Sequence, residues 1–363
     1  MALDRLFNVA RKEFSDHITS RRFIIILGLV LVISAIGMHS GIENYNTMLE
    51  SYSLQLQHMQ DLEGPYAGWM PEKPSIMLVF SSMMGYMTML GGILAIAIGF
   101  DLVSKEKETR SLKSLLSHPV YRDEIINGKA LGGVGALGFA MALALAIALA
   151  MLLIFSVVPT LDEFAAVLVF GAVTLGFLLA YFAVALMMST VAKESGNALI
   201  YTLVIFFAVS SLLPMFGAMA ANAFAGDPPE PPQMPRMPQE IVRTASSGGY
   251  FTSVSQSVVY GGTEDPEWKA YEEEMKTYIE KRRLISDISS LLSPQSNYQT
   301  IAIAVTQPQI FSMMQSPYDT APEETTGLAG ALGKVWMNIA ALIVFPSAFF
   351  AATYVKFMRM DIR

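Results

Sequence analysis

A charged segment between two strongly apolar stretches, residues 99–133, holds most of the groups that can recognise a partner. Its acids precede its bases by four residues at Asp101–Lys105 and Glu106–Arg110, which predicts a helix supported by ion pairs. The bases of the segment are Lys105, Lys107, Arg110, Lys113, Arg122 and Lys129. Leucines at 112, 115 and 116 predict an apolar face on this helix, which Pro119 ends before Glu124 starts the next. A short amphipathic helix of this kind is suited to docking on a soluble partner, although any inner membrane loop is also basic.

Several catalytic chemistries are excluded by what the sequence omits. The chain has no cysteine, so it has no thiol nucleophile, disulfide or cysteine metal site. His39 and Glu43 stand one helical turn apart, but no third metal ligand accompanies them. Gly128–Lys129 and Gly333–Lys334 lack the other residues of a phosphate-binding loop. Any energy for work must therefore come from a partner.

The composition defines a membrane protein. Hydrophobic residues make up 53% of the chain, charged residues 15%, and the mean hydropathy is +0.44, values outside the range of soluble domains. We expect an all-α polytopic membrane protein with six transmembrane helices. The predicted spans are 23–39, 76–100, 130–157, 164–191, 198–223 and 335–355. Spans two to six carry no ionisable residue in their apolar cores, which argues against a proton-driven carrier, an ion pump, a voltage-gated channel or a membrane hydrolase.

The two ends of the chain set its orientation. Residues 1–22 predict an amphipathic elbow helix on the inner membrane surface, and this pattern disfavours a cleaved signal peptide. The charged residues assigned to this elbow are Arg11, Lys12, Glu13, Arg21 and Arg22. Most short-loop bases lie in this helix, in the 101–129 loop, at Lys193 and in the tail, so both termini are predicted to be cytoplasmic. We assign 23–223 to spans one to five and 334–363 to span six and its tail.

A long outer segment, residues 224–333, separates spans five and six and predicts a helical extracytoplasmic insertion. It opens with a proline-rich linker. Asp265–Pro266 and Ser293–Pro294 then predict the starts of two helices, which we expect to pack as a hairpin in a small accessory subdomain.

Small residues recur at four-residue spacing at Gly91, Ala95 and Gly99, and at Gly128 and Gly132. This spacing permits close helix packing, either within one chain or at a dimer seam. Prolines at 214 and 346 predict kinks in spans five and six.

Three motifs resemble one family of membrane proteins. They are Ala10–Phe14 with Ser20–Phe23, the loop pattern from Lys105 to Lys129, and Ser293–Pro294. The chain resembles the permease subunit of type-2 ABC exporters, in the group that includes the nitrous-oxide-reductase maturation permease. It departs from the family pattern at Tyr121, where a serine is usual and would form a capping box with Glu124.

The resemblance implies a permease without catalytic activity of its own. Two copies would form a homodimer in the lipid bilayer of a prokaryotic cell membrane. Separate cytoplasmic ATPase subunits, which hold ATP and Mg, would bind this dimer. The resemblance implies no nucleic-acid partner. The residues that the resemblance assigns to ATPase coupling are Lys105, Glu106, Lys107, Glu108, Arg110, Leu112, Leu115, Leu116, Pro119, Arg122, Lys193 and Glu194. The alternatives are a non-transporting scaffold or assembly factor that docks another partner through the same loop, and a membrane enzyme acting from the outer subdomain.

Overall fold

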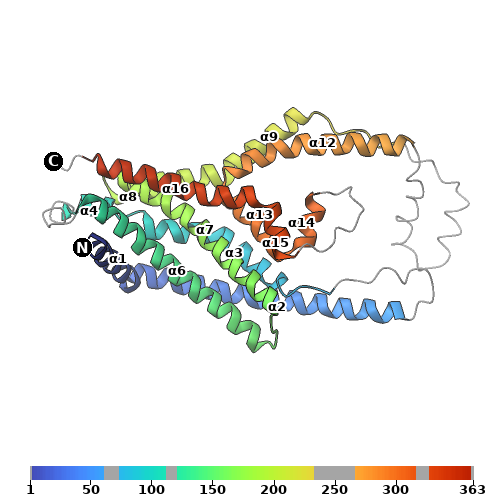
Figure 1. The fold of residues 1–363 in the computed structure, drawn as a ribbon, viewed down its shortest axis with the longest axis horizontal. Coiled ribbons are helices and arrows are strands. Elements are labelled where there is room, and N and C mark those ends of the chain that lie inside the picture. Colours follow the sequence, from blue (N-terminus) through green and yellow to red (C-terminus); the bar gives the residue numbers. More distant parts are fainter. Residues whose placement is uncertain (1, 61–72, 112–120, 233–265, 316–326, 361–363) are drawn as a thin grey trace, which may run out of the picture. The chain divides into compact units, whose positions relative to one another are not determined.

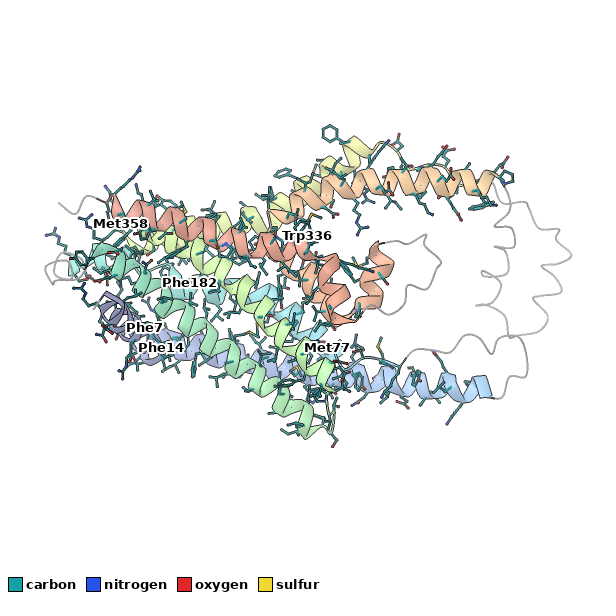
Figure 2. All side chains as sticks on the ribbon, viewed as in Figure 1. Phe7, Phe14, Met77, Phe182, Trp336 and Met358 are labelled. Carbon is teal, nitrogen blue, oxygen red and sulfur yellow. The ribbon has the colours of Figure 1, made fainter. Side chains whose placement is uncertain are left out.

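The computed structural model describes residues 2–60, 73–111, 121–232, 266–315 and 327–360. Every regular element in these ranges is a helix (Figure 1). Six helical stretches are long and apolar enough to cross a membrane, which confirms the predicted fold class. By contacts the chain forms two units, and most helices belong to the first. Figure 2 shows the side chains that these helices carry.

The N-terminal region forms two helices, α1 (Ala2–Thr19) and α2 (Arg21–Gln60), which are separated at Ser20. The Ser20 hydroxyl accepts a hydrogen bond from the Phe23 N–H at 3.2 Å and so caps the start of α2. We expected span one to end at residue 39 and a polar loop to follow, but α2 continues for 40 residues without a break. Ile42 and Tyr45 explain the difference, because both are buried and extend the apolar face of the helix.

Helix α7 (Leu161–Val191) is the centre of the first unit. It contacts α3 (Leu78–Gly99), α6 (Arg122–Ile154), α16 (Trp336–Met358) and α13 (Pro294–Thr306). Both ends of α7 are defined locally. Thr160 caps its start by accepting from the Glu163 N–H at 3.3 Å, and the helix ends at Val191 before an extended Ala192.

The two predicted helices of the outer segment both form, and they belong largely to different units. Helix α13 begins at Pro294 as predicted, where Ser293 accepts from the Ser296 N–H at 3.3 Å. It packs into the first unit, because its buried Tyr298 stacks on Phe177 with 4.7 Å between ring centroids. Helix α12 (Pro266–Leu291) begins where expected, but most of it lies in the second unit with α9 (Leu213–Ala225). The predicted cap at 265 lies outside the described residues.

The fifth span contains an irregularity next to the predicted proline kink. Helix α8 (Ser195–Phe207) runs into a five-residue π-helix, η2 (Ala208–Leu212), before α9 begins. The wider turn presents Ser210 to Tyr181, and the two hydroxyl oxygens lie 2.7 Å apart. A π-turn of this kind relieves the loss of backbone bonds near Pro214. The remaining short helices are α4 (Ser104–Glu108), α14 (Pro308–Gln315) and α15 (Leu328–Lys334).

The small-residue stripes pack within the chain. A Cβ atom built on Gly99 would lie 2.8 Å from the Ala185 Cβ on α7. On α6, a Cβ built on Gly132 would lie 2.6 Å from the Glu13 Cβ and 3.2 Å from the Ala10 carbonyl oxygen. Of the two alternatives left open by the sequence, the structure supports close contact inside one chain. Helix α1 therefore lies against α6 along its glycines.

Replacing Gly132 with alanine is expected to destabilise the α1–α6 contact by about 1–3 kcal/mol, the usual cost of overpacking. The neighbours that the new methyl group meets include backbone atoms, which cannot rotate away. Gly138 is the matched control, because it lies on the same helix with nothing within 4 Å of a built Cβ. Gly138→Ala should be neutral or stabilising by up to about 1 kcal/mol through helix propensity. Thermal unfolding of the two variants tests this, and equal melting temperatures would contradict the close α1–α6 contact.

Candidate functional site

The short helix α4 follows α3 after a four-residue turn, and its consecutive charged residues bind it to several neighbouring helices. Lys107 donates through Nζ to the carbonyl oxygens of Thr190 and, at 3.0 Å, Ala192 at the C-terminal end of α7. Glu108 accepts from the Ser195 N–H at 3.2 Å and from the Ser195 hydroxyl at 3.0 Å at the start of α8. A cation at a helix C-terminus and an anion at a helix N-terminus both complement the helix dipole. Each contact therefore has two effects: it stabilises one end of a membrane helix, and it holds α4 in position.

A buried serine joins the backbone of this region to α7. The Ser189 hydroxyl oxygen accepts from the N–H groups of Val103 at 2.9 Å and Ser104 at 3.0 Å. All three residues are buried. These bonds satisfy two donors at the start of α4 that have no partner within so short a helix.

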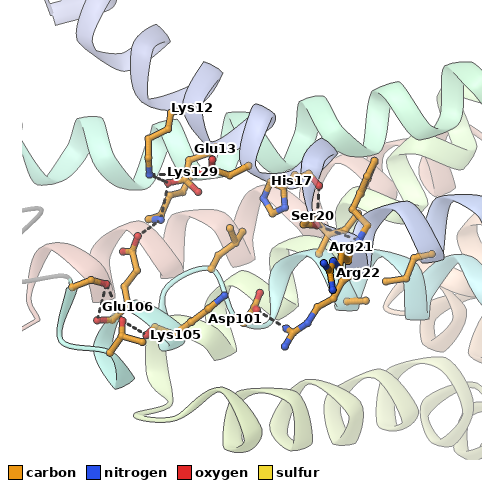
Figure 3. A pocket seen from close by; sticks show the side chains of 18 residues that line it. Lys12, Glu13, His17, Ser20, Arg21, Arg22, Asp101, Lys105, Glu106 and Lys129 are labelled. Carbon is orange, nitrogen blue, oxygen red and sulfur yellow. Dashed lines mark hydrogen bonds and ion pairs between the residues drawn. The ribbon is translucent and has the colours of Figure 1, made fainter.

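Lys129 is the centre of the ionic cluster at this end of the bundle (Figure 3). Its Nζ lies 3.0 Å from Glu13 Oε1 on α1 and 2.6 Å from Glu106 Oε1 on α4. Only 2% of the Lys129 side chain is exposed. The lysine itself lies on α6, so one buried ammonium group joins three helices.

Two of the ion pairs expected from local spacing are replaced by longer-range pairs. Asp101 pairs with Arg22 at 3.0 Å rather than with Lys105, and Glu106 pairs with Lys129 rather than with Arg110. An i,i+4 pair on an exposed helix contributes only about 0.2–0.5 kcal/mol. The Asp101 and Glu106 side chains are only 20% and 19% exposed, so water screens their tertiary pairs less than it would screen an exposed local pair, and the tertiary pairs form instead.

The start of α6 and the end of α16 are joined by further polar contacts. Arg5 on α1 donates to Glu124 at 3.1 Å and lies over the Tyr121 ring. Glu124 also accepts from the Tyr121 N–H at 3.1 Å, so one half of the usual capping box survives the replacement of serine. Arg122 donates to the Met358 and Met360 carbonyl oxygens at 3.3 and 2.9 Å. The charged end thus holds α1, α4, α6, α7, α8 and α16 together.

His17 lies on the face of α1 that adjoins this cluster. Burial lowers the pKa of His17 below its ordinary value, although the nearby carboxylates of Glu13 and Asp101 act in the opposite direction. Its Nε2 atom is buried without a hydrogen-bond partner in the described part of the chain. The fold therefore favours the neutral imidazole.

The pH dependence of stability should reveal this neutral state. Because the pKa of His17 is lower in the folded protein, the unfolded chain binds more protons below about pH 6.5, and the protein should lose stability as the pH falls through that range. His17→Asn should flatten this part of a melting profile recorded between about pH 5 and 8. His39→Asn is the control, since His39 is exposed beside Glu43. A profile that keeps its slope in His17→Asn would show that another group titrates.

The residues predicted from the sequence fall into three groups. Four of the predicted coupling residues are exposed and free to meet a partner, namely Lys105, Arg110, Lys193 and Glu194. Glu106, Lys107, Glu108 and Arg122 bind within the chain, as do Glu13, Lys12 and Arg22 of the elbow. Arg11 and Arg21 are exposed. Leu112, Leu115, Leu116 and Pro119 lie outside the described residues, so their role stays a prediction.

Three residues that hold the site together were not predicted. Lys129 was counted among the bases of the loop but was not assigned to the site, and neither Ser189 nor Arg5 was singled out. Lys129 gave only a weak signal, because a lysine at the start of an apolar span usually reaches the membrane interface without an ionic partner. Ser189 and Arg5 gave no local signal, since their partners lie far away in the sequence.

The arrangement is suited to transmitting movement between helix ends. In the described ranges no cluster of three or more His, Cys, Asp or Glu residues could hold a metal ion. The charged groups instead join helix ends, and the fold and site together define a multi-pass membrane protein with a tightly fixed loop helix.

The comparison with known families agrees with this class. The sequence matches the ABC-2 family transporter protein model over residues 7–362, nearly the whole chain, and the protein belongs to that family. A comparison with curated proteins finds no match. The protein is therefore a membrane permease component of an ABC transporter, and its family implies a nucleotide-binding partner.

Proposed function

We propose that this chain is the permease subunit of an ATP-driven exporter and that separate cytoplasmic ATPase subunits holding ATP and Mg drive it. The observation that carries the proposal is the attachment of α4. Through Glu106, Lys107 and Glu108, this helix is bound to α6, α7 and α8. A force applied to the adjoining segment 109–120 would therefore reach several membrane helices at once.

The ATPase would contact the side chains that remain outside this internal network. Arg110 is exposed and directly precedes the predicted loop leucines in the sequence, and Lys193 and Glu194 are exposed in the α7–α8 connection. Lys107 and Glu108 connect these two stretches. In this proposal the internal residues position the loop, and the exposed residues with the leucines make the contact.

The orientation follows from the distribution of bases. Arg11, Lys105, Lys193 and Arg359 all lie in short segments next to spans, and short basic segments stay on the cytoplasmic side. Both termini would then face the cytoplasm of a prokaryotic cell, with the chain in its cytoplasmic membrane.

A second copy and lipid would cover the apolar outer faces of the bundle. On α8, Ile200, Val204 and Phe207 form one stripe and are 57, 62 and 57% exposed. Such a stripe is stable only against lipid or another helix, and a homodimer would meet that need. The motifs around Arg11 and Arg22 support the proposal that the chain belongs to the group that includes the nitrous-oxide-reductase maturation permease.

Purification of the tagged permease from its own host tests the proposal. We expect an ATPase with phosphate-loop and signature motifs to copurify, and the reconstituted complex to hydrolyse MgATP and move substrate outward. An ATPase that copurifies but supports no transport would favour the alternative of a scaffold or assembly factor. A permease that captures no ATPase would overturn the proposal.

A further inference from the structure

A cavity of about 490 Å³ opens at the charged end of the first unit, between the α1–α2 junction and α4. Figure 3 shows His17 and Arg22 of the α1–α2 junction together with Asp101 and Lys105, and a dashed line joins Arg22 to Asp101. The buried Lys129 also lines the cavity and ties α1 to α4. The surrounding contacts therefore hold the walls of this cavity in place.

The cavity has more cations than its own carboxylates neutralise. Each acidic residue in its lining already has an ion-pair partner: Glu13 and Glu106 bind Lys129, Asp16 binds Lys12, and Asp101 binds Arg22. Arg21 and Lys105 also line it, and in the described ranges neither has an acidic partner. Because Glu13 and Glu106 share Lys129, the lining as a whole has five basic side chains against four carboxylates, and a negatively charged ligand near Arg21 and Lys105 would neutralise the surplus.

The start of α2 increases this need for negative charge. A helix N-terminus carries partial positive charge and normally attracts acidic residues. The first turn of α2 instead holds Arg21 and Arg22 and no acidic residue. Asp101 compensates Arg22 alone, so an anion near Arg21 would complete the electrostatics of the helix start.

One wall of the same cavity is apolar. Phe23, Ile26, Ile98 and Leu102 form it, together with Ala97. They belong to the beginning of α2 and to the end of α3 with its following turn, at the level where apolar spans meet the charged end. A free phosphate ion gains nothing from such a wall, whereas a lipid places its phosphate at the bases and its glycerol and first methylenes on the apolar side.

We propose that this cavity is a binding site for the phosphate headgroup of an anionic phospholipid. Arg21 and Lys105 contact the phosphate, and the Phe23–Ile26 wall holds the glycerol and the upper part of the acyl chains. Basic pockets between membrane helices bind anionic headgroups in this way. Binding would link the start of α2 to α4, and it requires no ATPase, so its test is independent of the proposed transport function.

Native mass spectrometry of the full chain in detergent tests the site with phosphatidylglycerol, phosphatidylcholine and soluble glycerol phosphate as probes. We expect phosphatidylglycerol to bind more tightly than either of the others. The double change Arg21→Gln with Lys105→Gln should weaken phosphatidylglycerol binding roughly 30-fold, the effect of two lost cation contacts. Ile26→Trp leaves every charge in place and should also weaken phosphatidylglycerol binding by filling the apolar side.

The matched control is the double change Arg11→Gln with Arg359→Gln. It removes the same charge from exposed positions on α1 and just after α16, at the charged end of the first unit, and neither residue lines the cavity. We expect its phosphatidylglycerol affinity to stay within about twofold of the parent. Equal losses in the two double variants, or equal binding of phosphatidylglycerol and phosphatidylcholine, would overturn the site. Glycerol phosphate that binds as tightly as phosphatidylglycerol would overturn the assignment to lipid.

Discussion

Replacing Lys129 with alanine is expected to destabilise the protein by about 3–5 kcal/mol, the usual cost of removing one partner from a buried ion pair. The change leaves Glu13 and Glu106 facing each other without the ammonium group that now lies 3.0 and 2.6 Å from them. Glu106 Oε2 is already buried without a partner in the described part of the chain. Both carboxylates would therefore have to take up protons or draw in water.

The control for this prediction is Lys105→Ala, which removes the same charge from an exposed position on α4. A surface change of this kind usually alters stability by less than about 0.5 kcal/mol. Combining Lys129→Met with Glu13→Gln and Glu106→Gln should recover part of the loss, because no buried charge then remains. Thermal unfolding of the three variants makes the comparison. A Lys129→Ala protein as stable as Lys105→Ala would mean that water already solvates the two carboxylates.

Replacing Leu115 with aspartate is expected to reduce ATPase capture by more than about tenfold, since an apolar contact is lost and a carboxylate is placed against an apolar groove. Membrane insertion should be unaffected, because the residue lies outside all six predicted spans. Copurification of the ATPase with the tagged permease measures the effect, and transport should fall with it.

Ser114→Asp is the matched control, because it adds the same charge one residue away at a polar position of the same segment. It should leave most of the ATPase bound. Glu106→Ala is a poorer control, since Glu106 is a partner of the buried Lys129 and its loss would disturb the fold. If Leu115→Asp captured as much ATPase as Ser114→Asp, the segment would be an ordinary basic loop without a docking role.

The parts of the fold that depend on local pattern could be predicted from the sequence. The apolar runs gave the six spans, Pro266 gave the start of α12, and Ser293–Pro294 gave the capped start of α13. Each of these signals lies within a few residues of the structure that it determines, so periodicity and capping rules suffice.

The parts that depend on distant partners could not be predicted. Glu13 and Lys129 are 116 residues apart, and no local rule connects them. The i,i+4 rule instead favoured Asp101–Lys105 and Glu106–Arg110, and it was wrong because the energy of an exposed local pair is small beside the need to neutralise a buried charge. The length of α2 was underestimated for another reason: the polar residues after position 40 hid the stripe formed by Ile42, Tyr45 and Leu49.

The unbroken course of α2 has a mechanical consequence. At 1.5 Å per residue its 40 residues make a rod about 60 Å long. Met38, Ile42 and Tyr45 are buried, so packing as well as the Arg22–Asp101 pair holds this rod over more than half of its length. Residues 51–58 are mostly exposed, and at 1.5 Å per residue they extend about 12 Å beyond the packed part. The rod therefore moves with the helices on which it packs, and a small rotation of those helices about the charged end would be amplified at the far tip of α2.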